Sequence, residues 1–425
     1  IAAINVLEVG AQVRVLNDDP DSETITLTVR AEPGRNGAPA AQALEGDLLI
    51  IIGGPEEVDG LRWWQVETAG GTEGWVVEGL VNADRDDAYE RTLLAVCPAE
   101  GERLTLRFGD YIVTTGLDGS DPCVLDYISV SAWTTFSHTT FGFDNRFVPS
   151  PDGEYVLYTD GMYGAEGNST LYRLNRDGSE RLALTDNMNV YWAAWSPDGQ
   201  RIAIANGQQI AMMRPDGSSY GVLAQEGAIY SWVGWLPDSE TIVYAEQSRW
   251  QDQMGTAIEY AFYRINILEG GLREILRTML DISSNPQISP DGSTLAIGGL
   301  EYSLIDGMSG NTPVQFYDEV LGVVIQFIDL ETDELVVASD EFFYITTWLP
   351  NGRGILVSDS YVLPANGGAP SVIEFSDDLP EAWNFIGWES DTVFLGYVGY
   401  GFEIEPDDYG IWAVDVTTGQ VERRM

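Results

Sequence analysis

The sequence predicts an all-β protein with two parts, a small N-terminal barrel and a larger set of repeated sheets. Nearly every apolar segment is five to eight residues long, is alternating or β-branched, and is bounded by Gly, Pro, Asp or Asn. Helical periodicity is scarce. A hairpin-turn motif recurs six times between residues 141 and 425. These observations favour strands joined by tight turns along the whole chain.

The composition restricts the partners of the protein. The 425 residues, 44% of them hydrophobic, suffice for about two domains. The formal net charge is −46, and all 21 basic residues are arginine. Such an anionic surface repels nucleic-acid phosphates and acidic lipid headgroups, so we expect no nucleic-acid binding and cations as small partners. This acidity is typical of a protein that works in high salt or of one exported to a cell surface.

Several features indicate a secreted, periplasmic or cell-surface protein of a prokaryote. No run approaches the roughly 20 apolar residues of a membrane span, so we expect no direct membrane insertion. The sequence shows no signal peptide and opens at "IAAINVLEVG" without methionine, which fits a processed start. Cys97 and Cys123 lie 26 positions apart, a spacing that permits one disulfide bond in an oxidising compartment. Two buried free thiols are the alternative.

Residues 1–81 predict the small barrel. They contain five short strands, "AQVRVLN", "ITLTVRAEPG", "LLIIIGG", "RWWQVET" and "TEGWVVEGLV", joined by turns rich in Gly, Pro and Asp. The order of "LTVRAEPG", "ALEGDLLIIIGG", "LRWWQVE" and "GTEGWVVEGLV" resembles the bacterial type of Src-homology-3 domain. That resemblance implies binding of cell-wall peptide or another extracellular ligand.

Three tryptophans of the barrel are candidate contact residues: Trp63, Trp64 and Trp75. Side chains alternate between the two faces of a strand, so Trp63 and Trp64 point to opposite faces. We therefore expect one of them in the core and the other exposed to a ligand.

A charged linker is predicted at residues 82–92, followed by closing strands or an extra blade at 93–140 and by the repeated unit at 141–425. The repeat is a turn such as "WSPDGQRIAIAN", in which Pro presets the backbone, Asp accepts amide hydrogen bonds and Gly takes positive φ. Its structural turn residues recur at intervals of 40 to 60 positions: Asp152, Asp198, Asp238, Asp291, Asn351 and Asp391. This period, with a second hairpin in each unit, predicts four-stranded β-propeller blades.

The repeats resemble the TolB-type propeller, whose signature is a strand ending in Trp followed by Ser-Pro-Asp-Gly. Six recurrences favour six blades. Residues 93–140 supply either a closing strand or a seventh blade. The recurrence also makes the aspartates turn residues, because positions on six separate hairpins are too dispersed to form one acid–base pair.

The sequence does not predict catalysis. "GSSYG" matches the Gly-x-Ser-x-Gly pattern of hydrolases but lies in a predicted hairpin turn. His138 is the only histidine, and no zinc-ligand spacing occurs. Carboxylate pairs are uninformative among 67 acidic residues.

Two sets of residues are candidate binding sites. Aromatic residues repeat near one mouth of the central channel, where they form a stacking surface or pack between blades: Tyr191, Trp192, Tyr230, Trp232, Phe343, Tyr344, Trp383 and Phe385. A run of carboxylates has the oxygen-ligand density of a Ca²⁺ site, with solvated charge as the alternative: Glu403, Glu405, Asp407 and Asp408. No other cofactor is predicted.

We therefore expect a non-catalytic adaptor of the cell envelope or extracellular space that binds protein or cell-wall glycan partners. A structural subunit of an extracellular lattice or filament, which binds copies of itself, is the first alternative. A carbohydrate-active hydrolase or lyase is the second.

Overall fold

The computed structural model describes an all-β chain. In the described residues every regular element is a strand, and no helix is long and apolar enough to span a membrane. The described residues are 7–16, 26–81, 89–101, 103–108, 111–116, 120–127, 148–161, 169–186, 188, 190–225, 229–248, 257–282, 284–309, 312–340, 345–358, 360–375, 384–398 and 410–424.

The chain forms two compact units, which we describe separately. Unit 1 comprises Ile1–Ser131, Gly153–Met162 and Tyr172–Ala183, and unit 2 comprises Ala132–Asp152, Tyr163–Leu171 and Leu184–Met425.

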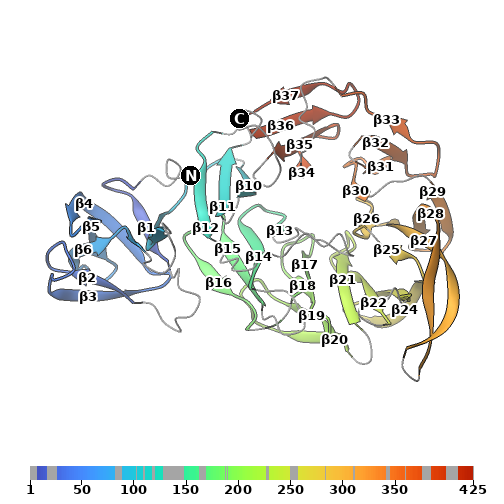
Figure 1. The fold of residues 1–425 in the computed structure, drawn as a ribbon, viewed down its shortest axis with the longest axis horizontal. Coiled ribbons are helices and arrows are strands. Elements are labelled where there is room, and N and C mark those ends of the chain that lie inside the picture. Colours follow the sequence, from blue (N-terminus) through green and yellow to red (C-terminus); the bar gives the residue numbers. More distant parts are fainter. Residues whose placement is uncertain are drawn as a thin grey trace. The chain divides into compact units, whose positions relative to one another are not determined.

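Unit 1 begins with the barrel, a seven-stranded sheet in the order β3-β2-β6-β5-β4-β1-β9 (Figure 1, blue). Its strands are β1 (Gln12–Val15), β2 (Thr26–Arg30), β3 (Pro39–Leu44), β4 (Leu48–Val58), β5 (Leu61–Thr68), β6 (Glu73–Val77) and β9 (Leu93–Ala95). The short strands β7 (Gly79–Val81) and β8 (Tyr89–Arg91) pair with each other. The barrel core contains Val13, Val29, Ile51 and Val66, all fully buried.

Seven further sheets are the blades of a β-propeller, so the predicted propeller is confirmed with seven blades, the count that the sequence allowed beside the favoured six. The additional blade is the three-stranded sheet β10 (Arg103–Phe108), β11 (Tyr111–Gly116) and β12 (Cys123–Tyr127). This blade lacks the Ser-Pro-Asp-Gly turn, and the blades were counted in the sequence by that turn. Cys97 and Cys123 form a disulfide bond, with their Cα atoms 5.8 Å apart.

The second and third blades run β13-β14-β15-β16 and β17-β18-β19-β20. Their strands are β13 (Val148–Pro149), β14 (Tyr155–Gly161), β15 (Ser169–Asn175), β16 (Arg181–Ala183), β17 (Trp192–Trp195), β18 (Ile202–Ala205), β19 (Gln209–Met213) and β20 (Gly221–Gln225). The fourth blade is β21 (Ile229–Trp235), β22 (Thr241–Gln247), β23 (Tyr260–Asn266) and β24 (Gly270–Thr278).

The fifth blade contains two much longer strands. It is built from β25 (Asp281–Ile282), β26 (Gln287–Ile288), β27 (Thr294–Ser309), β28 (Thr312–Asp329) and β29 (Leu335–Ser339). The sixth comprises β30 (Ile345–Trp348), β31 (Gly354–Val357), β32 (Tyr361–Pro364) and β33 (Ser371–Val372). The seventh comprises β34 (Asn384–Trp388), β35 (Val393–Val398), β36 (Gly410–Asp415) and β37 (Val421–Arg423).

A tryptophan precedes four of the six turns, at positions 195, 235, 348 and 388, and explains part of the repeat. The indole Nε1 of Trp195 donates to the carbonyl oxygen of Val148 at 3.0 Å, and that of Trp235 donates to Ala194 at 3.1 Å. Each bond joins one blade to the first strand of the preceding blade. The repeated Trp therefore joins neighbouring blades and is itself buried, since Trp195 and Trp235 are each 7% exposed.

A buried ion cluster lies within unit 1, between the barrel and the first two blades. Arg14 of β1 and Asp126 of β12 are each 1% exposed, and their Nη2 and Oδ1 atoms are 2.9 Å apart. The hydroxyl of Tyr158 donates to Asp126 Oδ2 at 2.5 Å, and the Arg181 Nε lies 3.5 Å from the same oxygen. These partners compensate the carboxylate for its lost hydration.

Candidate functional site

The outer half of the fourth blade brings acidic and aromatic residues to one face. Tyr244 and Glu246 are two positions apart on β22 and therefore share a face. The strand register places Tyr230 opposite Glu246, Tyr244 opposite Tyr263, and Tyr263 opposite Glu274. Residues far apart in the sequence thus meet across four neighbouring strands.

Three tyrosines lead from the core to the surface of this face. The rings of Tyr230 and Tyr244 lie 5.9 Å apart in an edge arrangement, and those of Tyr244 and Tyr263 are stacked at 5.4 Å. Tyr230 and Tyr244 are buried, whereas Tyr263 is half-buried. The outermost ring therefore has a rigid support and a polar tip that can contact solvent or a ligand.

Arg277 of β24 organises the charged groups beside Tyr263. Its Nη2 and Nε atoms donate to the two carboxylate oxygens of Glu274, at 2.7 and 3.3 Å, and its Nη1 donates to Glu259. Its Nη2 also lies 3.1 Å from the Tyr263 hydroxyl. With Glu246, these residues form what we call the carboxylate–tyrosine cluster: Glu246, Glu259, Tyr263, Glu274 and Arg277. Three carboxylates face one guanidinium.

The cluster shifts the pKa values of two glutamates in opposite directions. Burial raises the pKa of Glu246, the negative charge of Glu274 adds to this, and Arg277 opposes it. The hydrogen bond from Arg277 lowers the pKa of Glu274. One carboxyl is therefore the better proton holder and the other stays ionised, an arrangement suited to acid–base work or to binding of a cationic group.

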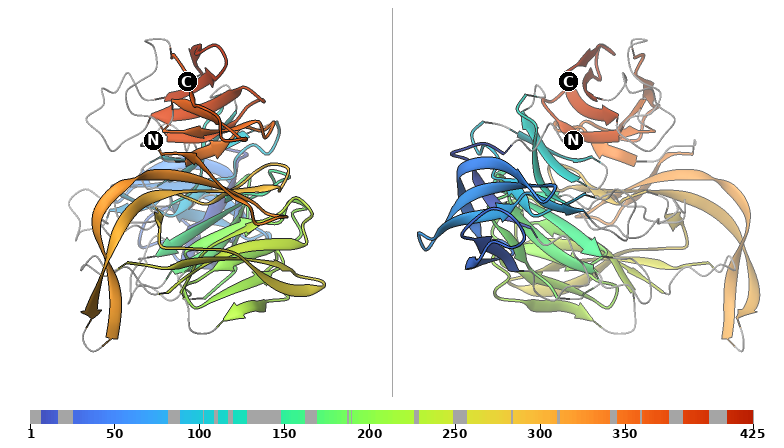
Figure 2. Two further views of the ribbon diagram at one scale, coloured as in Figure 1. Left: turned by 90° about the vertical axis from the view of Figure 1, so that its right-hand side faces the viewer. Right: turned by 60° about the vertical axis from the view of Figure 1, so that its left-hand side comes forward.

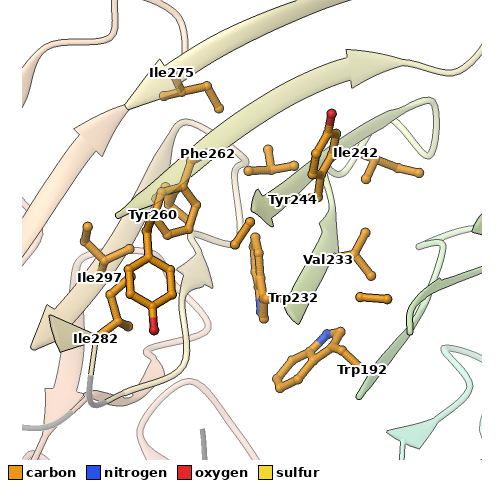
Figure 3. Close-up of a cluster of buried hydrophobic side chains, with 14 of the residues drawn as sticks. Trp192, Trp232, Val233, Ile242, Tyr244, Tyr260, Phe262, Ile275, Ile282 and Ile297 are labelled. Atoms are coloured by element: carbon orange, nitrogen blue, oxygen red, sulfur yellow. The ribbon is translucent and has the colours of Figure 1, made fainter. Parts of the chain in front are cut away.

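Of the five described aromatic residues predicted at the channel mouth, three are buried in the core. Trp192, Tyr230 and Trp232 are 8%, 3% and 2% exposed and belong to the large cluster shown in Figure 3. Tyr191 and Phe385 are half-buried. Three predicted residues lie outside the described part: Phe343, Tyr344 and Trp383. A ligand-binding role for this set stays a prediction.

The expectation that Trp63 or Trp64 is exposed was wrong, because both are 3% exposed. The Trp64 Nε1 donates to Glu78 at 2.9 Å, and the Arg62 guanidinium lies 5.9 Å from its ring. The ion pair of Arg62 and Glu78 therefore covers the ring of Trp64, although strand alternation predicts that either Trp63 or Trp64 is exposed. Trp75 is half-buried against the barrel core.

The turn residues make the hydrogen bonds that a turn requires. Asp198 Oδ1 accepts from the Ser196 hydroxyl at 2.6 Å and from the Gln200 amide at 3.0 Å. The same arrangement, an amide two positions onward, occurs at Asp238, Asp291 and Asn351. Asp152 accepts from the Ser150 hydroxyl at 2.6 Å. In the degenerate sixth copy of the turn, which contains Asp391, the accepting group is the hydroxyl of Ser390. It accepts a hydrogen bond from the Val393 amide at 3.1 Å.

The predicted calcium site lies outside the described part of the chain. All four carboxylates proposed for calcium lie there: Glu403, Glu405, Asp407 and Asp408. Among the described residues, no group of three or more His, Cys, Asp or Glu side chains is arranged to hold a metal ion.

Sequence reasoning missed the carboxylate–tyrosine cluster. Four of its members lie on three strands and Glu259 directly precedes β23, so they become neighbours only through the register of β22, β23 and β24. One local signal was available, since Arg277 and Glu274 stand three positions apart in "LREILRT". A glutamate and arginine at that spacing are too common in an acidic chain to indicate a site.

The family model of the bacterial SH3 domain matches residues 25–82, so the predicted Src-homology-3-like barrel is confirmed. Dipeptidyl-peptidase 5 of Porphyromonas gingivalis is 24% identical over 217 residues, which cover 49% of this chain and 30% of that protein. The match thus spans less than a third of the curated relative.

Solved structures include several that resemble the chain, two of which illustrate the similarity. An oligogalacturonate lyase in complex with manganese has a TM-score of 0.48 and 14% identity, and the match covers 77% of this chain and 86% of the lyase. A putative TolB from Agrobacterium tumefaciens has a TM-score of 0.39 and 18% identity, and the match covers 59% and 83%.

The match to a peptidase contradicts the prediction of a non-catalytic adaptor and the prediction that the protein is not an enzyme. The sequence led to that error because it shows no nucleophile signature on the propeller repeats. The comparisons thus show a bacterial SH3 domain at residues 25–82 and a stretch of the chain that is similar to part of a peptidase.

Proposed function

We propose that this chain takes part in peptide hydrolysis and that its propeller binds the peptide substrate at the carboxylate–tyrosine cluster. Support comes from the match to dipeptidyl-peptidase 5 and from the chemistry of the cluster. The observation that carries the proposal is the charge balance of the cluster, in which three carboxylates face the single guanidinium of Arg277 beside the stacked ring of Tyr263.

This arrangement favours peptides with a positive charge. Glu259, Glu274 and Arg277 are between 39% and 44% exposed, so a ligand can reach them from solvent. An ammonium or guanidinium group of the peptide would bind the carboxylates, and an adjoining apolar side chain would pack on the tyrosine. Because the charges are solvent-accessible, salt should weaken the interaction.

We also propose a location outside the cytoplasm, either secreted, periplasmic or at the cell surface. The disulfide bond between Cys97 and Cys123 supports this, since structural disulfides persist in oxidising compartments.

Two measurements test hydrolysis and binding separately. The full chain is incubated with a mixture of peptides, and mass spectrometry detects shortened products. Fluorescence anisotropy then compares a labelled lysine-rich peptide with a glutamate-rich peptide of equal length. We expect cleavage of cationic peptides and tighter binding of the lysine-rich probe.

The matched variants are Glu274→Gln and Glu269→Gln. Both remove one carboxylate from the fourth blade, but the exposed Glu269 lies in the turn between β23 and β24, at the other end of β24 from Arg277. Glu274→Gln should weaken the lysine-rich probe by about fivefold, whereas Glu269→Gln should leave its affinity within about twofold. Equal effects of the two variants, or no cleavage of any peptide, would refute the proposal.

A further inference from the structure

The fifth blade carries a hairpin that extends beyond its own sheet. Strands β27 and β28 have 16 and 18 residues, but β29 pairs only with residues 325–328 and β25 only with Gly299 and Leu300. We call residues 301–309 and 312–322 the β-arm. Both views in Figure 2 show it, in orange, reaching past the other strands of unit 2.

The β-arm is a preformed element. The amide of Ala257 donates to the carbonyl oxygen of Gln315 at 2.8 Å, and the amide of Ile258 donates to the Tyr317 hydroxyl at 3.2 Å. The rings of Tyr302 and Tyr317 lie 4.6 Å apart across the two strands. These contacts brace the β28 side. In the described structure the outer edge of β27 beyond Leu300 has no pairing strand.

The β-arm also exposes apolar side chains. Ile305, Val320 and Leu321 are 49%, 56% and 63% exposed. Natural proteins rarely leave a long strand edge open beside exposed apolar residues, because such an edge pairs with other chains. The combination indicates a surface that another polypeptide segment covers.

The negative charge around the β-arm indicates which kind of polypeptide segment can cover its free edge. Residues 278–352 contain 12 Asp or Glu residues and no Lys or Arg. Glu301, Asp306, Asp318 and Glu319 belong to the β-arm itself, and all four are exposed. A second copy of the chain would bring the same negative charges against them, so repulsion disfavours self-pairing. A partner with positive charges is complementary to the edge.

We propose that the β-arm docks an extended segment of a partner protein in which basic and apolar side chains alternate. The segment adds a strand to the free edge of β27, so that its backbone supplies hydrogen bonds, its apolar side chains pack on Ile305 on one face of the sheet, and its basic side chains bind Asp306 on the other. This interaction is separate from peptide hydrolysis and does not depend on it.

The probe is a fluorescent octapeptide of alternating arginine and valine, titrated into the full chain. A second peptide of the same composition carries N-methyl groups on alternate residues, which removes backbone donors without changing charge. Binding should weaken by about tenfold or more on N-methylation, as expected from the loss of about two hydrogen bonds.

The variants locate the site. Ile305→Arg places a positive charge on the β-arm, and Leu268→Arg places the same charge at another exposed apolar residue of unit 2, in the turn between β23 and β24. We expect Ile305→Arg to weaken probe binding by about tenfold, and Leu268→Arg and Glu274→Gln to leave it within about twofold. The Glu274→Gln result separates this site from the carboxylate–tyrosine cluster. Circular dichroism confirms that each variant is folded.

Three results would overturn the docking proposal. The first is equal binding of the N-methylated and unmodified probes, which would exclude strand pairing. The second is an equal loss for Ile305→Arg and Leu268→Arg. The third is sedimentation showing a dimer that Ile305→Arg dissociates, which would make a second copy of the chain the occupant.

Discussion

Removing the guanidinium of Arg14 should destabilise unit 1 strongly. In Arg14→Met, Asp126 loses the 2.9 Å ion pair, and the carbonyl oxygen of Leu125 loses a 3.1 Å hydrogen bond. Removing one partner of a buried ion pair costs about 3 to 5 kcal/mol. Because Tyr158 and Arg181 still contact the carboxylate, we expect the low end, about 3 kcal/mol.

The assay is urea unfolding combined with hydrogen exchange of the β1 and β12 amides, since a chain of two units need not unfold in one step. Asp126→Asn and the double variant with Arg14→Met complete a double-mutant cycle. The double variant should be less destabilised than the sum of the single variants. A loss below about 1 kcal/mol for Arg14→Met, or strict additivity, would refute the assignment of a coupled buried pair.

The same cluster predicts a pH dependence. Burial raises the pKa of Asp126, but Arg14, Arg181 and the Tyr158 hydroxyl together outweigh it and hold the pKa below its ordinary 3.8. The folded state therefore binds this proton less readily than the unfolded state does. The resulting stability is complete above about pH 5 and is lost as the pH falls through 3.8 and below. Asp126→Asn should flatten the unfolding free energy over that range.

Three further outcomes follow from local geometry. Asp198→Asn keeps the accepting oxygen of its turn and should cost about 0.5 kcal/mol in thermal unfolding, against about 1 kcal/mol for Asp198→Ala; equal losses would show that the charge matters. Gly419 and Gly270 both have positive φ, 70° and 75°, but only at Gly419 would an added Cβ lie 1.8 Å from a carbonyl oxygen. The melting temperature should therefore fall further for Gly419→Ala than for Gly270→Ala. Similar falls for both variants would contradict a steric origin. Replacing Cys97 and Cys123 with serine should cost about 3 kcal/mol in calorimetry, and an unchanged transition would show that the bond is not stabilising.

The repeated turns determined most of the fold from sequence. Pro, Asp and Gly at fixed positions specify a local backbone conformation, and this local chemistry is the same in any context. It placed the blades that contain the motif and the hairpin around Asp198. The additional blade was ambiguous because β10 to β12 contain no such turn, and only their pairing shows a complete sheet.

The tertiary structure decided where side chains meet. Strand alternation assigned one barrel tryptophan to solvent, yet Arg62 of the same strand pairs with Glu78, just after β6, and the two cover Trp64. Arg14 and Asp126 are 112 positions apart, and their pairing leaves no local pattern. The turn chemistry and the strand period are local and can be read from neighbouring residues. The buried ion cluster, the carboxylate–tyrosine cluster and the free edge of the β-arm depend on register and packing between distant strands, which the linear sequence does not display.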